Sequence, residues 1–186
     1  MKFLVTATAL LSTALAGPVS SLRFAKRQSC DPTNDPSIDS VSGAITNWLH
    51  DVQTVNSFLD NVPPVGSTAL QQAAQNTLQS ANDEPNELSI LASICELNPG
   101  DPPYAQAVLL LQEVFGNVPT NLQKIIDNFG DAGTVATSLQ VINNVRCCNV
   151  LPALDVIWLT AAEDYGLVGS VTTDVPRPNS CSTVQC

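Results

Sequence analysis

Basic residues are scarce in this 186-residue sequence, which has 7 Lys and Arg, 17 Asp and Glu, and a single His. Four of the seven basic residues lie within the first 27 positions. The rest of the chain therefore carries three basic residues against all 17 acids, a net charge of −14. So acidic a surface repels nucleic acids and anionic membranes, and we exclude DNA and RNA as partners. With so few cations, ion pairs cannot be a main source of stability.

Long apolar runs are also few. After the N-terminus no apolar run approaches the ~18 residues of a membrane span, so we expect no transmembrane segment. The N-terminal run, residues 3–16, follows a short basic start and ends in small residues, with Ala16 last. This pattern is typical of a secretory signal peptide over residues 1–16. The protein is therefore expected to be secreted and extracellular.

A dibasic pair, Lys26-Arg27, lies between this segment and the first cysteine. An ordinary surface pair is the alternative, but the position resembles the processing site of fungal secreted proproteins. We therefore expect residues 17–27 to be a propeptide and Gln28 to begin the mature chain.

The remaining sequence predicts an all-α fold, with a helical domain over residues 28–166. Apolar residues recur in steps of three and four, which places them on one face of each helix. Period-two alternation, the mark of strands, is almost absent before residue 167. The expected helices, divided by Pro and Gly, cover residues 38–62, 67–81, 83–97, 104–115, 119–129, 134–146 and 152–166. The third of these is alternatively a kinked continuation of the second.

The prediction is thus a bundle of about six or seven amphipathic helices, followed by an extended tail over residues 167–186. Asp35-Pro36 is expected to cap the first helix, and Ser67 or Thr68 the second. Seven apolar faces bury a sizeable core, so the fold should not depend on disulfides. A monomer is expected.

The six cysteines of the chain are Cys30, Cys95, Cys147, Cys148, Cys181 and Cys186. Secretion and an even count favour three disulfides. Neighbouring Cα atoms lie about 3.8 Å apart, below the roughly 4.4–6.8 Å of a disulfide, so Cys147 and Cys148 should not bond each other. No C-x-x-C spacing supports a zinc or redox site.

Each chain end gains from attachment to the helix that ends near Cys147. We expect Cys30 and Cys181 to pair with Cys147 and Cys148, in either order. Cys95 would then pair with Cys186, unless it is a buried free thiol that behaves as a small apolar residue.

The sequence offers no set of catalytic residues, and we expect a protein that is not an enzyme and has no cofactor or metal. His50 stands without a G-x-S-x-G elbow or a cysteine-protease signature, and is interpreted as a surface imidazole. The acidic pairs 83–84 and 163–164 are interpreted as helix-boundary residues rather than glycosidase carboxylates. The acidic stretches 31–39 and 127–131 lack the glycine and glutamate of an EF-hand.

Four segments carry a resemblance to a known group: TVNSFL, ANDEPN, RCCNVLP and RPNSC. With the signal peptide and the Lys-Arg site, they resemble small secreted cysteine-containing proteins of filamentous fungi. The resemblance implies a candidate effector in virulence, or a surface-acting protein, without a catalytic motif. A looser similarity, weakened by the six cysteines, is to fungal hydrophobic-surface-binding helical proteins, some of which hold lipids.

Two functions follow as expectations. In the first, the protein is a non-enzymatic interaction protein that acts outside the cell on an extracellular protein of a host. In the second, it carries an apolar ligand such as a lipid or sterol between its helices. Richness in Ala, Val, Leu and Ile with nine aromatic residues favours the second. An internal cavity would support the carrier, whereas a solid core with an exposed apolar patch, for instance at residues 62–65, would support the interaction protein.

Overall fold

The computed structural model describes residues 32–186, which form an all-α bundle. The α-helices are α1 (Ile38–Asp60), α2 (Thr68–Ala92), α3 (Pro102–Val114), α4 (Asn117–Asp127), α5 (Ala132–Val145) and α6 (Leu151–Asp164). A π-helical turn, η2 (Arg146–Val150), joins α5 to α6, and 3-10 turns lie at Pro32–Asn34 (η1) and Asn179–Thr183 (η3). The all-α prediction is confirmed.

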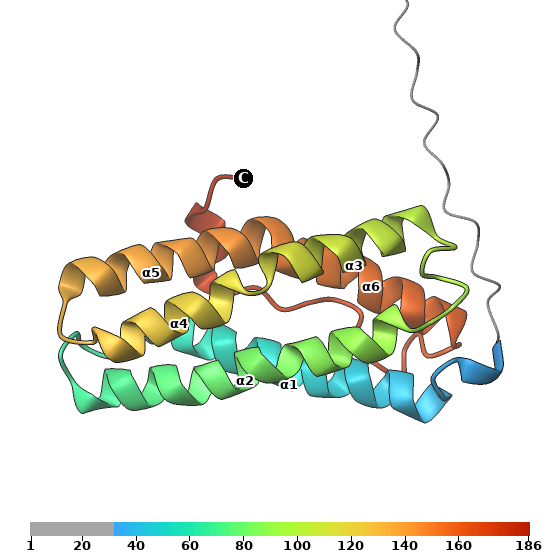
Figure 1. Cartoon of the computed structure of the whole chain (residues 1–186), viewed down its shortest axis with the longest axis horizontal. Coiled ribbons are helices and arrows are strands. Elements are labelled where there is room, and N and C mark those ends of the chain that lie inside the picture. The colour runs from blue at the N-terminus through green and yellow to red at the C-terminus, as the bar shows by residue number, and fades with distance from the viewer. Residues whose placement is uncertain (1–31) are drawn as a thin grey trace, which may run out of the picture.

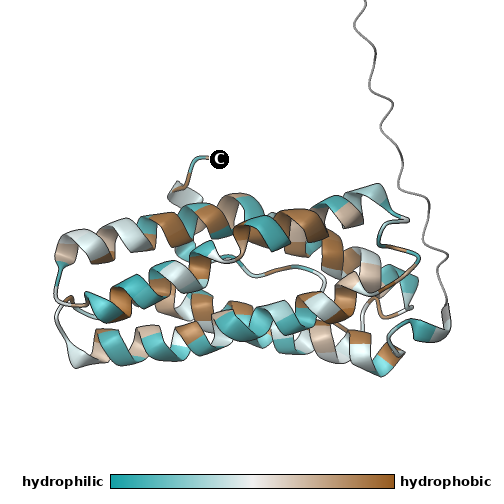
Figure 2. Ribbon diagram, viewed as in Figure 1, coloured by the Kyte–Doolittle hydropathy of each residue, from teal (hydrophilic) through white to brown (hydrophobic). Residues whose placement is uncertain are grey.

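The predicted count of six or seven separate helices is wrong, because the elements combine into four antiparallel rods (Figure 1). The rods are α1, α2, α3 followed by α4, and the continuous run α5–η2–α6. Each rod returns along its predecessor, as in an up-down-up-down four-helix bundle. Figure 2 shows apolar and polar residues on different faces of the rods.

Two prolines mark expected helix starts. Pro85 lies within α2, so the alternative that the third helix continues the second is confirmed. Pro152 lies in the first turn of α6 as expected, although η2 joins this helix to α5 without a break. Proline lacks the backbone donor of a regular helix and crowds the preceding turn, so α2 continues past Pro85 without that hydrogen bond. At Pro152, the wider π-turn just before it interrupts the regular ladder where that donor is missing.

Side-chain caps fix most helix starts. Ser37 accepts the backbone N–H of Ser40 and is the cap of α1, so the prediction of Asp35-Pro36 is wrong. Ser67, one of the two predicted caps of α2, accepts the N–H of Leu70. Between these helices Gly66 adopts φ 81°, a left-handed conformation that favours glycine.

The core consists of two buried clusters along the bundle. The first, which we call the tryptophan core, includes Trp48, Trp158 and Tyr104 with aliphatic residues of α1, α2, α3 and α6. The second, the α4 core, is built around Leu122 and Ile125 with residues of α1, α2 and α5. The two indole rings meet edge to face, with centroids 6.3 Å apart.

The run Ala132–Asp164 is long and apolar enough to cross a membrane, with a mean hydropathy of 1.3 over its most apolar window. Half of that window is buried inside the bundle. Because core helices of globular proteins share these properties, this is weak evidence for a span, and the sequence-based expectation of no transmembrane segment stays a prediction.

Candidate functional site

Two disulfides attach the C-terminal tail to η2. Cys147 bonds Cys181, and Cys148 bonds Cys186. The adjacent cysteines thus reach two different partners, and Cys181 takes one of the two expected places. The tail crosses the bundle to get there: Asn56 Nδ2 of α1 donates to the carbonyl of Pro176 at 2.8 Å, and Asp60 accepts the N–H of Asn179 at 2.7 Å (Figure 1).

The expected bond between Cys95 and Cys186 is wrong, because Cys186 is bonded to Cys148. The expected bond from Cys30 to Cys147 or Cys148 is wrong for the same reason, since both have tail partners. The free-thiol alternative for Cys95 is also wrong, as Cys95 is disulfide-bonded. Sequence spacing did not reveal that the tail folds back far enough to use both adjacent cysteines.

The processing residues Ala16, Lys26 and Arg27, and Cys30 itself, lie outside the described residues. The predicted signal peptide and propeptide, residues 1–27, therefore stay predictions. His50 lies on the exposed side of α1, next to the buried Asp51.

The Asp83-Glu84 pair lies in the middle of α2, so its interpretation as a helix boundary is wrong. Glu84 is fully buried and pairs with the equally buried Arg146 at 3.4 Å. The indole N–H of Trp48 donates to the other carboxylate oxygen of Glu84 at 2.7 Å. Arg146 also donates to the side-chain oxygen of Asn56 at 3.0 Å, which connects the pair to the tail through Pro176.

Burial dominates the protonation of this pair. Burial raises the pKa of Glu84 to about 7, although Arg146 and the Trp48 hydrogen bond act in the opposite direction. Burial also lowers the pKa of Arg146, against the attraction of Glu84. Charges taken out of water lose hydration that one partner restores incompletely. Within the described chain, Nε of Arg146 has no hydrogen-bond partner.

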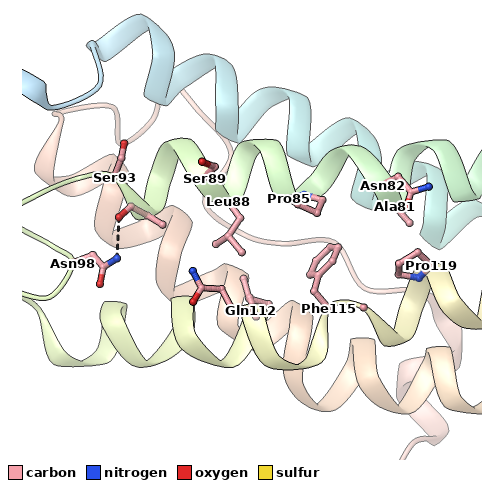
Figure 3. A pocket seen from close by; sticks show the side chains of 13 residues that line it. Ala81, Asn82, Pro85, Leu88, Ser89, Ser93, Asn98, Gln112, Phe115 and Pro119 are labelled. Atoms are coloured by element: carbon pink, nitrogen blue, oxygen red, sulfur yellow. Dashed lines mark hydrogen bonds between the residues drawn. The ribbon is translucent and has the colours of Figure 1, made fainter.

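A groove of about 590 Å³ lies on the surface between α2 and the junction of α3 and α4 (Figure 3). Its floor is apolar: Leu88 comes from α2, and Leu111 and Phe115 from α3 and its C-terminal end. Its edges carry uncharged polar side chains. The lining contains no Asp, Glu, Lys or Arg, and consists of Ala81, Asn82, Pro85, Leu88, Ser89, Ala92, Ser93, Asn98, Leu111, Gln112, Phe115, Gly116 and Pro119.

The polar edge is partly occupied by structural hydrogen bonds. Asn98 donates to the carbonyl of Ala92 at 2.9 Å, which holds the end of α2 (Figure 3). Asn82, Ser89 and Gln112 are exposed, and the described structure gives their side chains no hydrogen bond. These three remain available to another molecule.

A second hollow, of about 470 Å³, shares Asn82 and Pro119 with the first and extends the groove along α2 and α4. Its lining includes Leu78 of α2. A basic residue and an acidic residue of α4, Lys124 and Asp127, also line this second hollow. The lining on α2 thus runs from Leu78 to Ser93, about 22 Å at 1.5 Å per residue.

Comparison with family models, with curated proteins and with solved structures found no match to this chain.

Proposed function

We propose that this chain is a secreted, non-enzymatic interaction protein of the fungal candidate-effector type, and that the groove along α2 binds an extracellular protein of a host. The groove is the observation that carries the proposal. It lies open on the surface of a bundle whose interior holds two clusters of buried apolar side chains, and an open surface groove is the arrangement expected of an interaction protein.

An extended segment of the partner fits this groove best. A strand rises about 3.3 Å per residue, so six or seven residues span the length of the lining. Amide and hydroxyl side chains both donate and accept hydrogen bonds, and Asn82, Ser89 and Gln112 offer these groups along the edge. The apolar floor suits small apolar side chains. The lining is uncharged except at the end beside Lys124 and Asp127, which favours a segment without charge at its centre.

The other expected properties support the same proposal. The disulfides are compatible with an extracellular protein. His50, the single histidine of the chain, is not among the residues that line the groove. An acid–base or nucleophilic mechanism in the groove would therefore have to proceed without histidine.

Selection of displayed heptapeptides on the purified protein tests the proposal. Ser89→Trp fills the groove from its edge, whereas Gln79→Trp places the same indole on an exposed part of α2 outside the lining. We expect enriched peptides with uncharged centres that bind the wild type and Gln79→Trp, and bind Ser89→Trp at least about tenfold more weakly. Peptides that bind all three proteins equally would contradict the groove as the site.

The apolar-ligand carrier remains the second candidate, because about 590 Å³ is within the size range of ligand pockets and the floor is apolar. Native mass spectrometry of the secreted protein distinguishes the two. A co-purified lipid or sterol that is lost in Ser89→Trp and kept in Gln79→Trp would favour the carrier.

A further inference from the structure

Three carboxylates come together where α1 packs on α2. Asp51 belongs to α1, and Asp83 and Glu87 lie one turn apart on α2. One oxygen of each lies within 4.8 Å of the other two. Asp51 is 6 % exposed and Glu87 5 %, whereas Asp83 is exposed and connects the cluster to solvent.

Glu87 gives an independent indication of a ligand. Its Oε2 atom is buried and has no hydrogen-bond partner in the described chain. A buried oxygen without a partner is costly, and such atoms are rare in native structures. A carboxylate oxygen of the same side chain lies within 4.8 Å of one oxygen of Asp51 and one of Asp83. A bound cation would satisfy it.

Among the described residues, no Lys or Arg pairs with the cluster. The described residues contain three Lys and Arg, and each has another partner: Arg146 pairs with Glu84, Arg177 with Asp155, and Lys124 donates to Asn121. Burial raises the pKa of both Asp51 and Glu87, and the neighbouring Asp83 raises both further. Opposing effects come from the Ser80 hydroxyl and His50 at Asp51, and from a backbone hydrogen bond at Glu87.

We propose that Asp51, Asp83 and Glu87 form a calcium site between α1 and α2. Calcium prefers carboxylate oxygens at 2.3–2.6 Å, so two ligands on opposite sides of the ion are about 4.6–5.2 Å apart. The three oxygens lie within 4.8 Å of one another, which is compatible with one shared calcium ion. Magnesium requires near-ideal octahedral geometry and gives up its water reluctantly, so three carboxylates from two helices, two of them buried, suit the flexible coordination of calcium better.

The arrangement also provides access and orientation. Asn86 donates to Oδ1 of Asp83 at 2.6 Å, which fixes this carboxylate and leaves Oδ2 for the ion. Water completes the coordination from the solvent side, where Asp83 is exposed. Motif spacing predicted no metal site because the three ligands come from two helices, and Asp51 is 32 positions from Asp83.

Calcium titration of the full mature protein, freed of metal with a chelator, tests the site by calorimetry and by thermal melting. Glu87→Gln and Asp51→Asn remove one buried charge each, and Glu113→Gln is the matched control, an exposed glutamate on α3. We expect calcium to bind and raise the melting temperature of the wild type and Glu113→Gln. In Glu87→Gln and Asp51→Asn the affinity for calcium should fall about tenfold or more. Loss of a residue that merely supports a metal ligand already lowers metal affinity about 10–100-fold, and these two residues are proposed as ligands themselves.

A second readout separates the site from a simple loss of folding. In chelator, Glu87→Gln should melt no lower than the wild type, because the amide removes a buried charge from a cluster of like charges. The wild type should melt higher than Glu87→Gln once calcium is added. Absence of calcium binding by the wild type, equal binding by all variants, or binding of magnesium in preference to calcium would each overturn the proposal.

Discussion

The two cores of the bundle differ in what they contain and in what holds them together. The tryptophan core contains both indoles and Tyr104, and it packs against Leu167, Val175 and the tail cysteine Cys181. The α4 core is aliphatic apart from Phe58 among its fully buried members, and includes no residue of the tail. The C-terminal segment therefore contributes apolar packing to one half of the molecule, and it reaches the other half through polar contacts such as that of Asp60 with Asn179.

The buried ion pair lies at the border between the two cores. Along α2, Glu84 stands between Ala81 of the α4 core and Leu88 of the tryptophan core. On the last rod, Arg146 stands between Ile142 of the α4 core and Val150 of the tryptophan core. The pair thus interrupts the apolar interior at its midpoint, and the cores are expected to respond differently when one partner is removed.

The largest expected effect is that of Arg146→Met. Loss of the guanidinium leaves Glu84 buried beside an apolar side chain, and such a change costs about 3–5 kcal/mol. Because Glu84 can take up a proton, the cost should be larger at pH 8 than at pH 5. Chemical denaturation at both pH values measures this.

The double variant Arg146→Met, Glu84→Leu is the control for this prediction. With neither charge present, much of the lost stability should return, since apolar residues of similar volume often replace buried pairs without cost. A double variant as unstable as Arg146→Met would show that the size or shape of Arg146, rather than the unpaired charge, causes the loss.

The next effect is that of the disulfides. In the chain-entropy account, a closed loop of 34 residues, as between Cys147 and Cys181, contributes about 3–4 kcal/mol. Reduction should therefore lower the melting temperature and release the tail, while the helical circular dichroism signal remains at room temperature. Complete loss of helix would mean that the two cores cannot fold without these bonds.

Hydrogen exchange makes the comparison between the halves sharper. After reduction, amides of helices in the tryptophan core should lose more protection than those of α4, which the tail does not cover. Equal loss in both halves would show that the bundle unfolds as one unit, so that the distinction between the cores has no energetic meaning.

The sequence predicted the faces of the helices well, because apolar spacing follows directly from the helical period. It also contained the ion pair. Glu84 continues the buried positions Leu70, Ala74, Thr77, Ala81, Leu88 and Leu91 of α2 in steps of three and four, and Arg146 does so after Ile142. The helix break expected between residues 81 and 83 concealed Glu84, because only the alternative, a continued helix, keeps its spacing to Ala81 in register. The spacing of charged residues on an apolar stripe was the signal that could have found it.

The rest could not be predicted because it depends on tertiary packing. A proline within a helix costs about 3 kcal/mol or more, so the continuation of α2 past Pro85 depends on the stability that packing supplies, which single-sequence patterns do not report. Cysteine positions leave the connectivity open as well: six cysteines allow 15 pairings. Asp51, Asp83 and Glu87 meet only because α1 and α2 pack in this register.

A smaller effect is expected from pH in the wild type, measured in chelator so that calcium plays no part. The pKa of Glu84 is about 7 in the folded protein and 4.5 in the unfolded chain. The protonated form is therefore favoured by folding, and its contribution is fully present below pH 4.5 and lost as pH rises through about 7. Asp51 and Glu87 have raised pKa values and act in the same direction.

Melting temperatures between pH 4.5 and 8.5 should accordingly decrease toward high pH, most steeply between the two pKa values of Glu84, 4.5 and about 7, and level off above that range. Glu84→Gln should flatten this dependence, because the amide does not titrate. The matched change Glu96→Gln, at a position without such burial, should leave it unaltered. A wild type that gains stability as pH rises through 7 would show that the attraction of Arg146 outweighs burial.

The smallest effect is expected from the second ion pair, Arg177 with Asp155, which ties the tail to α6. The two side chains are 35 % and 43 % exposed, and an exposed pair contributes about 0–1 kcal/mol. Asp155 also accepts the backbone N–H of Val175 at 3.2 Å, so Asp155→Asn weakens two attachments of the tail.

With both disulfides intact, Asp155→Asn should unfold within about 1 kcal/mol of the wild type, because the bonds at Cys147 and Cys148 keep the tail in place. After reduction it should lose residues 167–186 to protease faster than the reduced wild type, since the polar contacts are then the remaining restraint. Arg177→Met, which keeps the Val175 hydrogen bond, should fall between the two. Equal cleavage of all three reduced proteins would show that apolar packing of Leu167 and Val175, rather than Asp155, holds the tail against the tryptophan core.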